Sequence, residues 1–162
     1  MFPEGYEFKR GDSFKQYEFY SEGPKGRIRK VIFYSYLGRQ DGYAYYNLGF
    51  GDYDPRTRHI SDLTVSDNKD RDKILATVAA TALDFTARRV RCRILVKGST
   101  PARTRLYQIK IVAYFDAIFE LFDIQYQTEQ GIWEAFKRGE KSFRFLFERR
   151  NFGYASDSKK EE

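Results

Sequence analysis

Residues 91–107 read RCRILVKGSTPARTRLY, and this stretch decides the fold because its periodicity changes from that of a strand to that of a helix. Up to residue 97, side chains at even positions are apolar and most at odd positions are basic, which predicts a half-buried strand. Gly98 then ends the strand, Thr100 is a typical N-cap, and Pro101 suits the first helical position because a proline there loses no hydrogen bond. The expected apolar stripe of this helix consists of Ala102, Leu106, Ile109 and Ala113.

Helix and strand signals on both sides of this stretch complete an α+β order. Upstream, residues 68–89 carry apolar side chains at helical spacing, with N-cap candidates at 66–68. β-Branched and aromatic runs predict strands over 17–21, 27–37, 43–50 and 60–65. Further strands are expected over 118–126 and 143–147, with a short helix over 131–138. The predicted fold is a single mixed, largely antiparallel sheet with two main helices packed on it, in the order ββββ-α-β-α-β.

The composition favours one small domain with a buried core. The chain has 162 residues, of which 41% are hydrophobic and 18% aromatic, so wholesale disorder is excluded. We expect one α+β domain over residues 1–150 and a disordered C-terminal tail over residues 151–162. One cysteine and one histidine exclude a disulfide framework and a Cys-rich zinc site, and we expect neither a metal nor a cofactor. No apolar run is long enough for a signal peptide or a membrane span, so we expect a cytoplasmic protein without a membrane partner.

The net charge of +6 is concentrated in one segment of the chain. Between Asp84 and Asp116 there is no acidic residue but there are eight basic ones, so the rest of the chain carries a net charge of −2. Arg91, Arg93 and Lys97 alternate along the predicted strand and would form a basic track on one face of the sheet. The alternative is a solvated surface, which is the usual role of a run of charges.

The turn before the second helix predicts an anion site. Free N–H groups at a helix start bind anions, and a glycine permits close approach of the backbone. The predicted anion-binding residues are Gly98, Ser99, Thr100, Arg103, Arg105 and Tyr107. The alternative is an ordinary strand-to-helix turn with a threonine N-cap, because the segment lacks the spacing of a Walker loop.

Other residues give weaker predictions. His59 has no histidine or cysteine partner for a metal site, and Cys92 is expected to be a small buried side chain rather than a nucleophile. Asp52, Asp54 and Asp62 are candidates for paired carboxylates. Aromatic side chains on the predicted hairpin can stack nucleic-acid bases or pack within the sheet; they are Tyr34, Tyr36, Tyr43, Tyr45 and Tyr46.

Several segments together resemble a family of small, functionally uncharacterised bacterial proteins. The most specific is GSTPARTRLY at 98–107. It is preceded by YxF at 17–19, GPKGxI at 23–28, YNLxFGD at 46–52 and ILATVA at 74–79. The resemblance spans residues 17–150 and implies a bacterial intracellular protein, with no activity attached.

A looser topological resemblance connects the chain with GCN5-like acyltransferases. A strand at 63–65 is followed by a long helix, a strand and a helix that opens with Ala102-x-x-x-Leu106-Tyr107. In those enzymes a glycine-containing loop between the first strand and the long helix holds the pyrophosphate of coenzyme A. Here the loop at 66–73 has no glycine and three aspartates, which would repel a pyrophosphate, so the cofactor loop would be atypical.

We therefore expect a small basic bacterial module that binds a phosphate-rich ligand, above all nucleic acid, at the Gly98–Thr100 helix start. Arg103 would be the charge partner of the phosphate, unless Arg103 and Arg105 meet internal carboxylates such as Asp62. Two alternatives are a GCN5-like acyltransferase and a protein-binding component of a toxin–antitoxin or phage-defence pair. Whether the protein is an enzyme is left open by the sequence.

Overall fold

The computed structural model describes residues 3–13, 15–61, 68–98, 100–137 and 144–150. In chain order the elements are β1 (Lys9–Arg10), β2 (Gln16–Gly23), β3 (Gly26–Gln40), β4 (Tyr43–Asp54), β5 (His59–Ser61), α1 (Arg71–Ala87), β6 (Cys92–Val96), α2 (Pro101–Ala113), α3 (Phe115–Leu121), β7 (Phe122–Gln127), β8 (Trp133–Ala135) and β9 (Phe145–Arg149). The predictions for Ser99, for residues 62–67 and for the tail at 151–162 lie outside the described residues.

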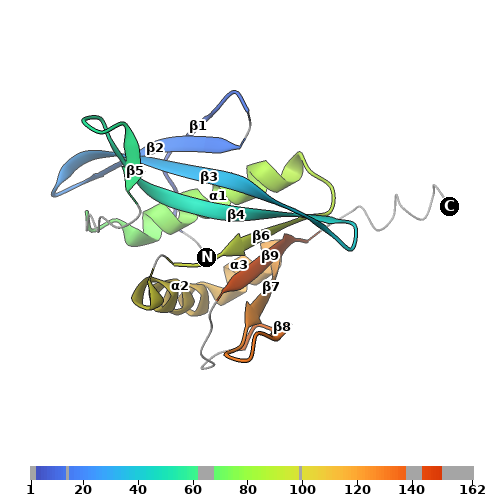
Figure 1. The fold of residues 1–162 in the computed structure, drawn as a ribbon. Coiled ribbons are helices and arrows are strands. Elements are labelled where there is room, and N and C mark those ends of the chain that lie inside the picture. Colours follow the sequence, from blue (N-terminus) through green and yellow to red (C-terminus); the bar gives the residue numbers. More distant parts are fainter. Residues whose placement is uncertain (1–2, 14, 62–67, 99, 138–143, 151–162) are drawn as a thin grey trace.

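All the described strands belong to one sheet (Figure 1). Their order is β1-β2-β3-β4-β6-β9-β7-β8, and β5 pairs with the end of β4. The strands β4 and β6 are parallel, whereas the other described pairs are antiparallel. The predicted α+β class, with one mixed and largely antiparallel sheet, is therefore confirmed. A GCN5-like order of elements stays a prediction.

The long β3–β4 hairpin forms at a two-residue turn. Asp41 and Gly42 both have positive φ, 54° and 81°, which is the conformation whose twist matches the twist of the flanking strands. Further along the hairpin Phe33 lies opposite Gly49, and a Cβ atom at Gly49 would come within 2.2 Å of the Phe33 ring. The phenylalanine thus covers the glycine and replaces the side chain that this position lacks.

The helices cover one face of the sheet and enclose an aromatic core there. Phe85 of α1 stacks on Tyr34 of β3 at 4.1 Å between ring centroids and meets Tyr46 of β4 edge-on at 4.9 Å. In Figure 1, α1 runs along the long strands β3 and β4, and α3 lies behind β6 and β9. No helix in the described part of the chain is long and apolar enough to cross a membrane.

Two predicted elements near the C-terminus are wrong. Residues 131–138 were expected to form a helix, but Trp133–Ala135 is strand β8, because a turn with Gly131 at positive φ folds it back onto β7. The strand expected over 118–126 begins only at Phe122, since Ile118 belongs to α3 and is buried in the core.

The predicted helix boundaries also need correction. Helix α1 begins three residues later than expected because Asn68 does not cap it. The Asn68 side chain instead accepts from Lys25 N at 2.7 Å and donates to Gly26 O at 2.9 Å, which closes the β2–β3 turn. The stripe predicted for α2 is only partly right: Leu106 is half-buried, but the buried residues are Thr104 and Ile111, and Ile109 is exposed.

Candidate functional site

A cavity of about 300 Å³ lies between the sheet and the three helices. Strands β3, β4, β6, β7 and β9 line one side of it, and α1, α2 and α3 line the other. Its wall is mostly apolar and consists of Leu48, Phe50, Ile74, Leu75, Val78, Ala79, Ala82, Ile94, Val96, Leu106, Ile111, Ile118, Phe122 and Phe147. Ligand pockets of proteins start at about this size and have this mainly apolar character.

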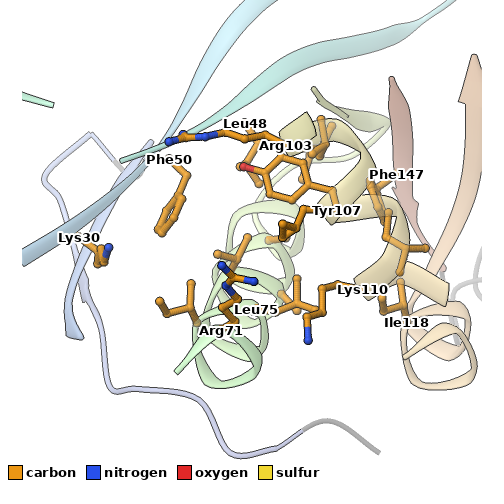
Figure 2. A pocket seen from close by; sticks show the side chains of 18 of the residues that line it. Lys30, Leu48, Phe50, Arg71, Leu75, Arg103, Tyr107, Lys110, Ile118 and Phe147 are labelled. Carbon is orange, nitrogen blue, oxygen red and sulfur yellow. The ribbon is translucent and has the colours of Figure 1, made fainter. Parts of the chain in front are cut away.

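Four basic side chains add positive charge to this apolar wall. Lys30 comes from β3, Arg71 from α1, and Arg103 and Lys110 from α2. Figure 2 shows Lys30 on one side of the cavity, Ile118 and Phe147 on the opposite side, and the Arg103 side chain extending from α2 toward Phe50. The cavity therefore combines an apolar body with a cationic part of its lining.

Lys30 and Asp52 form a buried ion pair in the cavity wall. They lie directly opposite each other on β3 and β4, and both point toward the helices. The side chain of Lys30 is 4% exposed and that of Asp52 is 14% exposed. Burying two charges costs free energy that their attraction only partly offsets, so apolar residues of similar volume would stabilise the fold equally well. A buried ion pair is thus uncommon in a cavity wall whose role is purely structural.

The other three cations differ in their partners. Lys110 donates to Asp72 at 2.6 Å, and this hydrogen bond, together with one from Tyr114, lowers the pKa of the Asp72 carboxyl. Within the described part of the chain, the side chains of Arg71 and Arg103 have no carboxylate partner. Because Asp62 lies outside the described residues, its pairing with Arg103 stays an open alternative. Two guanidinium groups beside an apolar cavity are suited to holding an anion.

The predicted anion site at the helix start is largely occupied by contacts within the chain. The Gly98 N–H donates to Thr104 Oγ1 at 3.0 Å, and Thr100 Oγ1 accepts from Arg103 N at 3.2 Å. A Cβ atom at Gly98 would come within 2.4 Å of Thr104 N, so the glycine serves close packing of the turn against α2. The N-cap and the first-position proline are confirmed. Anion binding by this turn stays a prediction.

Among the described residues, the structure brings two of the predicted anion-binding residues into the cavity. Arg103 and Tyr107 line it, whereas Thr100 and Arg105 are exposed and Gly98 is buried outside it. The side chain of Arg103, the predicted charge partner of the phosphate, reaches into the cavity lining, which lies deeper in the protein than the turn.

The predicted basic track is not continuous along β6. Arg91 precedes the strand and has positive φ, 52°, so the alternation of side chains does not extend to it. Arg93 donates to Tyr45 at 2.8 Å and pairs with Glu148 at 3.4 Å, while Lys97 is exposed beyond the strand end.

Among the weaker candidates, Cys92 is buried, Asp54 accepts a hydrogen bond from a neighbouring backbone N–H, and His59 is exposed. Burial raises the pKa of the Cys92 thiol to about 11, so the thiol stays protonated at neutral pH, as expected of a small buried side chain. Asp54 accepts from Arg56 N at 2.9 Å, which lowers its pKa, and it does not share the Lys30 partner of Asp52. His59 is exposed on β5, and the described residues contain no cluster of potential metal ligands.

Sequence reasoning missed three of the four cations of the cavity. Lys30 could have been found, since it interrupts the inward-facing series Ile28, Lys30, Ile32 and Tyr34 of β3. Arg71 and Lys110 gave no such signal, because charged residues are ordinary on one side of any helix.

The comparisons with known proteins support an uncharacterised family, whereas the GSTPARTRLY signature and a bacterial origin stay predictions. Residues 3–150 match a family of unknown function, DUF6934. The chain belongs to this family. No curated protein matches the chain, and no solved structure does. The matched range extends from the first to the last of the described residues.

Proposed function

We propose that the protein binds, in the cavity between sheet and helices, a small ligand with an apolar body and a phosphate or other anionic group. The observation that carries this proposal is the combination of an apolar cavity of about 300 Å³ with Arg71 and Arg103 in its lining, beside Lys30 and Lys110, which are paired with Asp52 and Asp72. The apolar wall gives affinity to the body of the ligand. The arginines hold its anionic group with charge-assisted hydrogen bonds.

This proposal retains part of the expectation drawn from the sequence. A phosphate stays the expected anionic group, with Arg103 as its charge partner, but the site lies in the cavity rather than at the Gly98–Thr100 turn. The acyltransferase alternative predicts a ligand of the same chemistry, because an acyl-coenzyme A also joins an apolar acyl group to phosphates. Of the loop aspartates that argued against it, Asp70 accepts from Tyr6 at 2.7 Å and Asp72 binds Lys110.

Isothermal titration with a series of alkyl phosphates, used below their micelle concentrations, tests the proposal. Each buried methylene contributes about 0.8 kcal/mol, so two more methylenes tighten binding about 15-fold until the cavity is full. The alcohol of the same chain length binds more weakly because it lacks the charge. Acetyl-coenzyme A and a longer acyl-coenzyme A, titrated in parallel, show whether the anionic group belongs to a coenzyme.

A variant pair locates the site. Arg103→Ala removes a charged hydrogen bond worth about 1.5–3 kcal/mol, which weakens alkyl phosphate binding roughly 10- to 150-fold and leaves alcohol binding unchanged. Arg88→Ala is the matched control, because Arg88 lies at the C-terminal end of α1 and does not line the cavity. Affinity that is independent of chain length, or equal losses in the two variants, would contradict the proposal.

A further inference from the structure

The face of the sheet opposite the helices carries a different set of side chains. Successive residues of a strand point to opposite faces, so Arg29 lies on the face away from Lys30, and Tyr53 on the face away from Asp52. The same alternation places Arg93 of β6 opposite to the buried Ile94. This face does not line the cavity.

Four arginines on this face lie over aromatic rings. The stacks, with the distance from the guanidinium carbon to the ring centroid, are Arg27 over Tyr20 (3.9 Å), Arg29 over Tyr53 (4.3 Å), Arg93 over Tyr43 (3.8 Å) and Arg144 over Trp133 (5.6 Å). We call these eight residues the stacked face. The stacks involve residues on or next to β2, β3, β4, β6 and β8, strands that extend over most of the sheet order.

A guanidinium group that lies over an aromatic ring still carries N–H groups at its edge. Arg29 and Arg93 use part of this edge on Glu18 and Glu148, while Arg144 donates to the Gln127 amide. A guanidinium has five N–H donors, so such a contact does not exhaust it. The stacked face with these two carboxylates has a net charge of +2, and Arg27 and Tyr20 are exposed.

Flat cationic and aromatic groups at intervals are the features that bind unpaired nucleotides. Bases stack on aromatic and guanidinium planes, and phosphates accept hydrogen bonds from arginine. In a duplex the base faces are hidden, and an acidic peptide offers charge without a plane to stack. We propose that the stacked face binds single-stranded nucleic acid. The stacked face contains no residue that lines the cavity or belongs to the Gly98–Thr100 turn, so this proposal is independent of the cavity ligand.

Fluorescence of the protein itself gives a direct test, because Trp133 is the only tryptophan of the chain. Titration with oligo-dT and oligo-U of about 12 nucleotides, a typical site size for single-strand binders, is expected to quench this tryptophan. Affinity should fall with salt by about 0.7 log units per phosphate contact for each tenfold increase in concentration. Comparison of the affinities for oligo-dT and oligo-U shows whether DNA or RNA is the ligand.

Variants then connect binding to the stacks. Tyr20→Ala combined with Arg27→Gln removes one stack at an exposed position and should weaken oligonucleotide binding at least about fivefold. Tyr43→Leu removes another, and circular dichroism confirms that each variant is folded. Arg88→Gln is the control, since it makes the same change of charge at the end of α1.

Several outcomes would overturn the proposal. They are no quenching and no binding, equal affinity for a duplex of the same length, equal competition by polyglutamate, or an equal loss in Arg88→Gln. If Arg103→Gln weakens oligonucleotide binding as much as the stack variants do, the nucleotide occupies the helix start or the cavity instead. Retention of oligonucleotide binding in Arg103→Gln, with loss in the stack variants, supports the stacked face.

Discussion

Replacing Lys30 by methionine tests whether the Lys30–Asp52 ion pair in the cavity wall is shielded from water, as the low exposure of both side chains indicates. Methionine is similar in length to lysine but carries no charge, so the variant keeps the packing and removes the ion pair with the buried Asp52 carboxylate. The partner variant, Asp52→Leu, leaves the ammonium group instead. The double variant removes both charges together and converts this part of the wall to apolar side chains.

The exposed fractions of the Lys30 and Asp52 side chains set the expected losses of unfolding free energy. Lys30 is 4% exposed and Asp52 is 14% exposed, so each remaining charge would be mostly desolvated. Removing one member of a buried pair costs about 3–5 kcal/mol, whereas an apolar replacement of both is about neutral or stabilising. At about 2–4 °C per kcal/mol for a chain of this size, Lys30→Met should lower Tm by roughly 6–12 °C at the lower end of that cost.

Urea denaturation of the wild type, both single variants and the double variant provides the free energies of a double-mutant cycle. We expect the double variant to recover most of the loss of each single variant. It should bind alkyl phosphates about as tightly as the wild type, because Lys30 and Asp52 are removed together and Arg71 and Arg103 remain in the lining. A loss below about 1 kcal/mol in Lys30→Met, which is typical of exposed ion pairs, would refute the buried pair. So would simple additivity of the two single losses.

Three further predictions concern the helices and the thiol. Thr104→Val should lose about 1–3 kcal/mol of unfolding free energy, since it leaves the buried Gly98 N–H without its acceptor, and Thr104→Ser should lose less; urea denaturation measures both. Lys110→Met should lose no more than about 1 kcal/mol at pH 7, because Asp72 is 45% exposed in its side chain. The lowered pKa of Asp72 means that this contribution is present above its unfolded pKa of about 3.9 and disappears as the pH falls through the folded value, so thermal melts of the two proteins should converge in acid. Cys92 should resist a thiol reagent at pH 8 in the native protein and react only after unfolding; rapid native labelling would contradict its raised pKa.

Local signals predicted much of the fold. Alternation of side chains predicted the strands of the first half, and Thr100 with Pro101 predicted the start of α2, because these signals act over a few neighbouring residues. The errors occur where long-range contacts override local preference. Asn68 is a good N-cap by type, but its side chain binds the β2–β3 turn, and Thr104 is polar but buried because its hydroxyl binds Gly98.

The candidate sites were less predictable than the fold. The sequence indicated Arg103 and Tyr107 as ligand-binding residues, and both line the cavity. Of the hairpin tyrosines that it indicated as stacking platforms, Tyr43 belongs to the stacked face, whereas Tyr34 and Tyr46 are buried in the aromatic core. Partner choice between side chains from different strands depends on the register of the sheet, which no local pattern reveals.

By itself, the sequence determined a basic α+β domain and the turn between β6 and α2, and it predicted an anionic ligand. These features follow from composition and periodicity, which are properties of the chain alone. Only the tertiary structure decided where the cations act. Lys30, Arg71 and Arg103 are far apart in the chain and meet at one cavity because the sheet order and helix packing bring β3, α1 and α2 together. Periodicity assigns a residue to a face of its own element, whereas packing decides what that face meets.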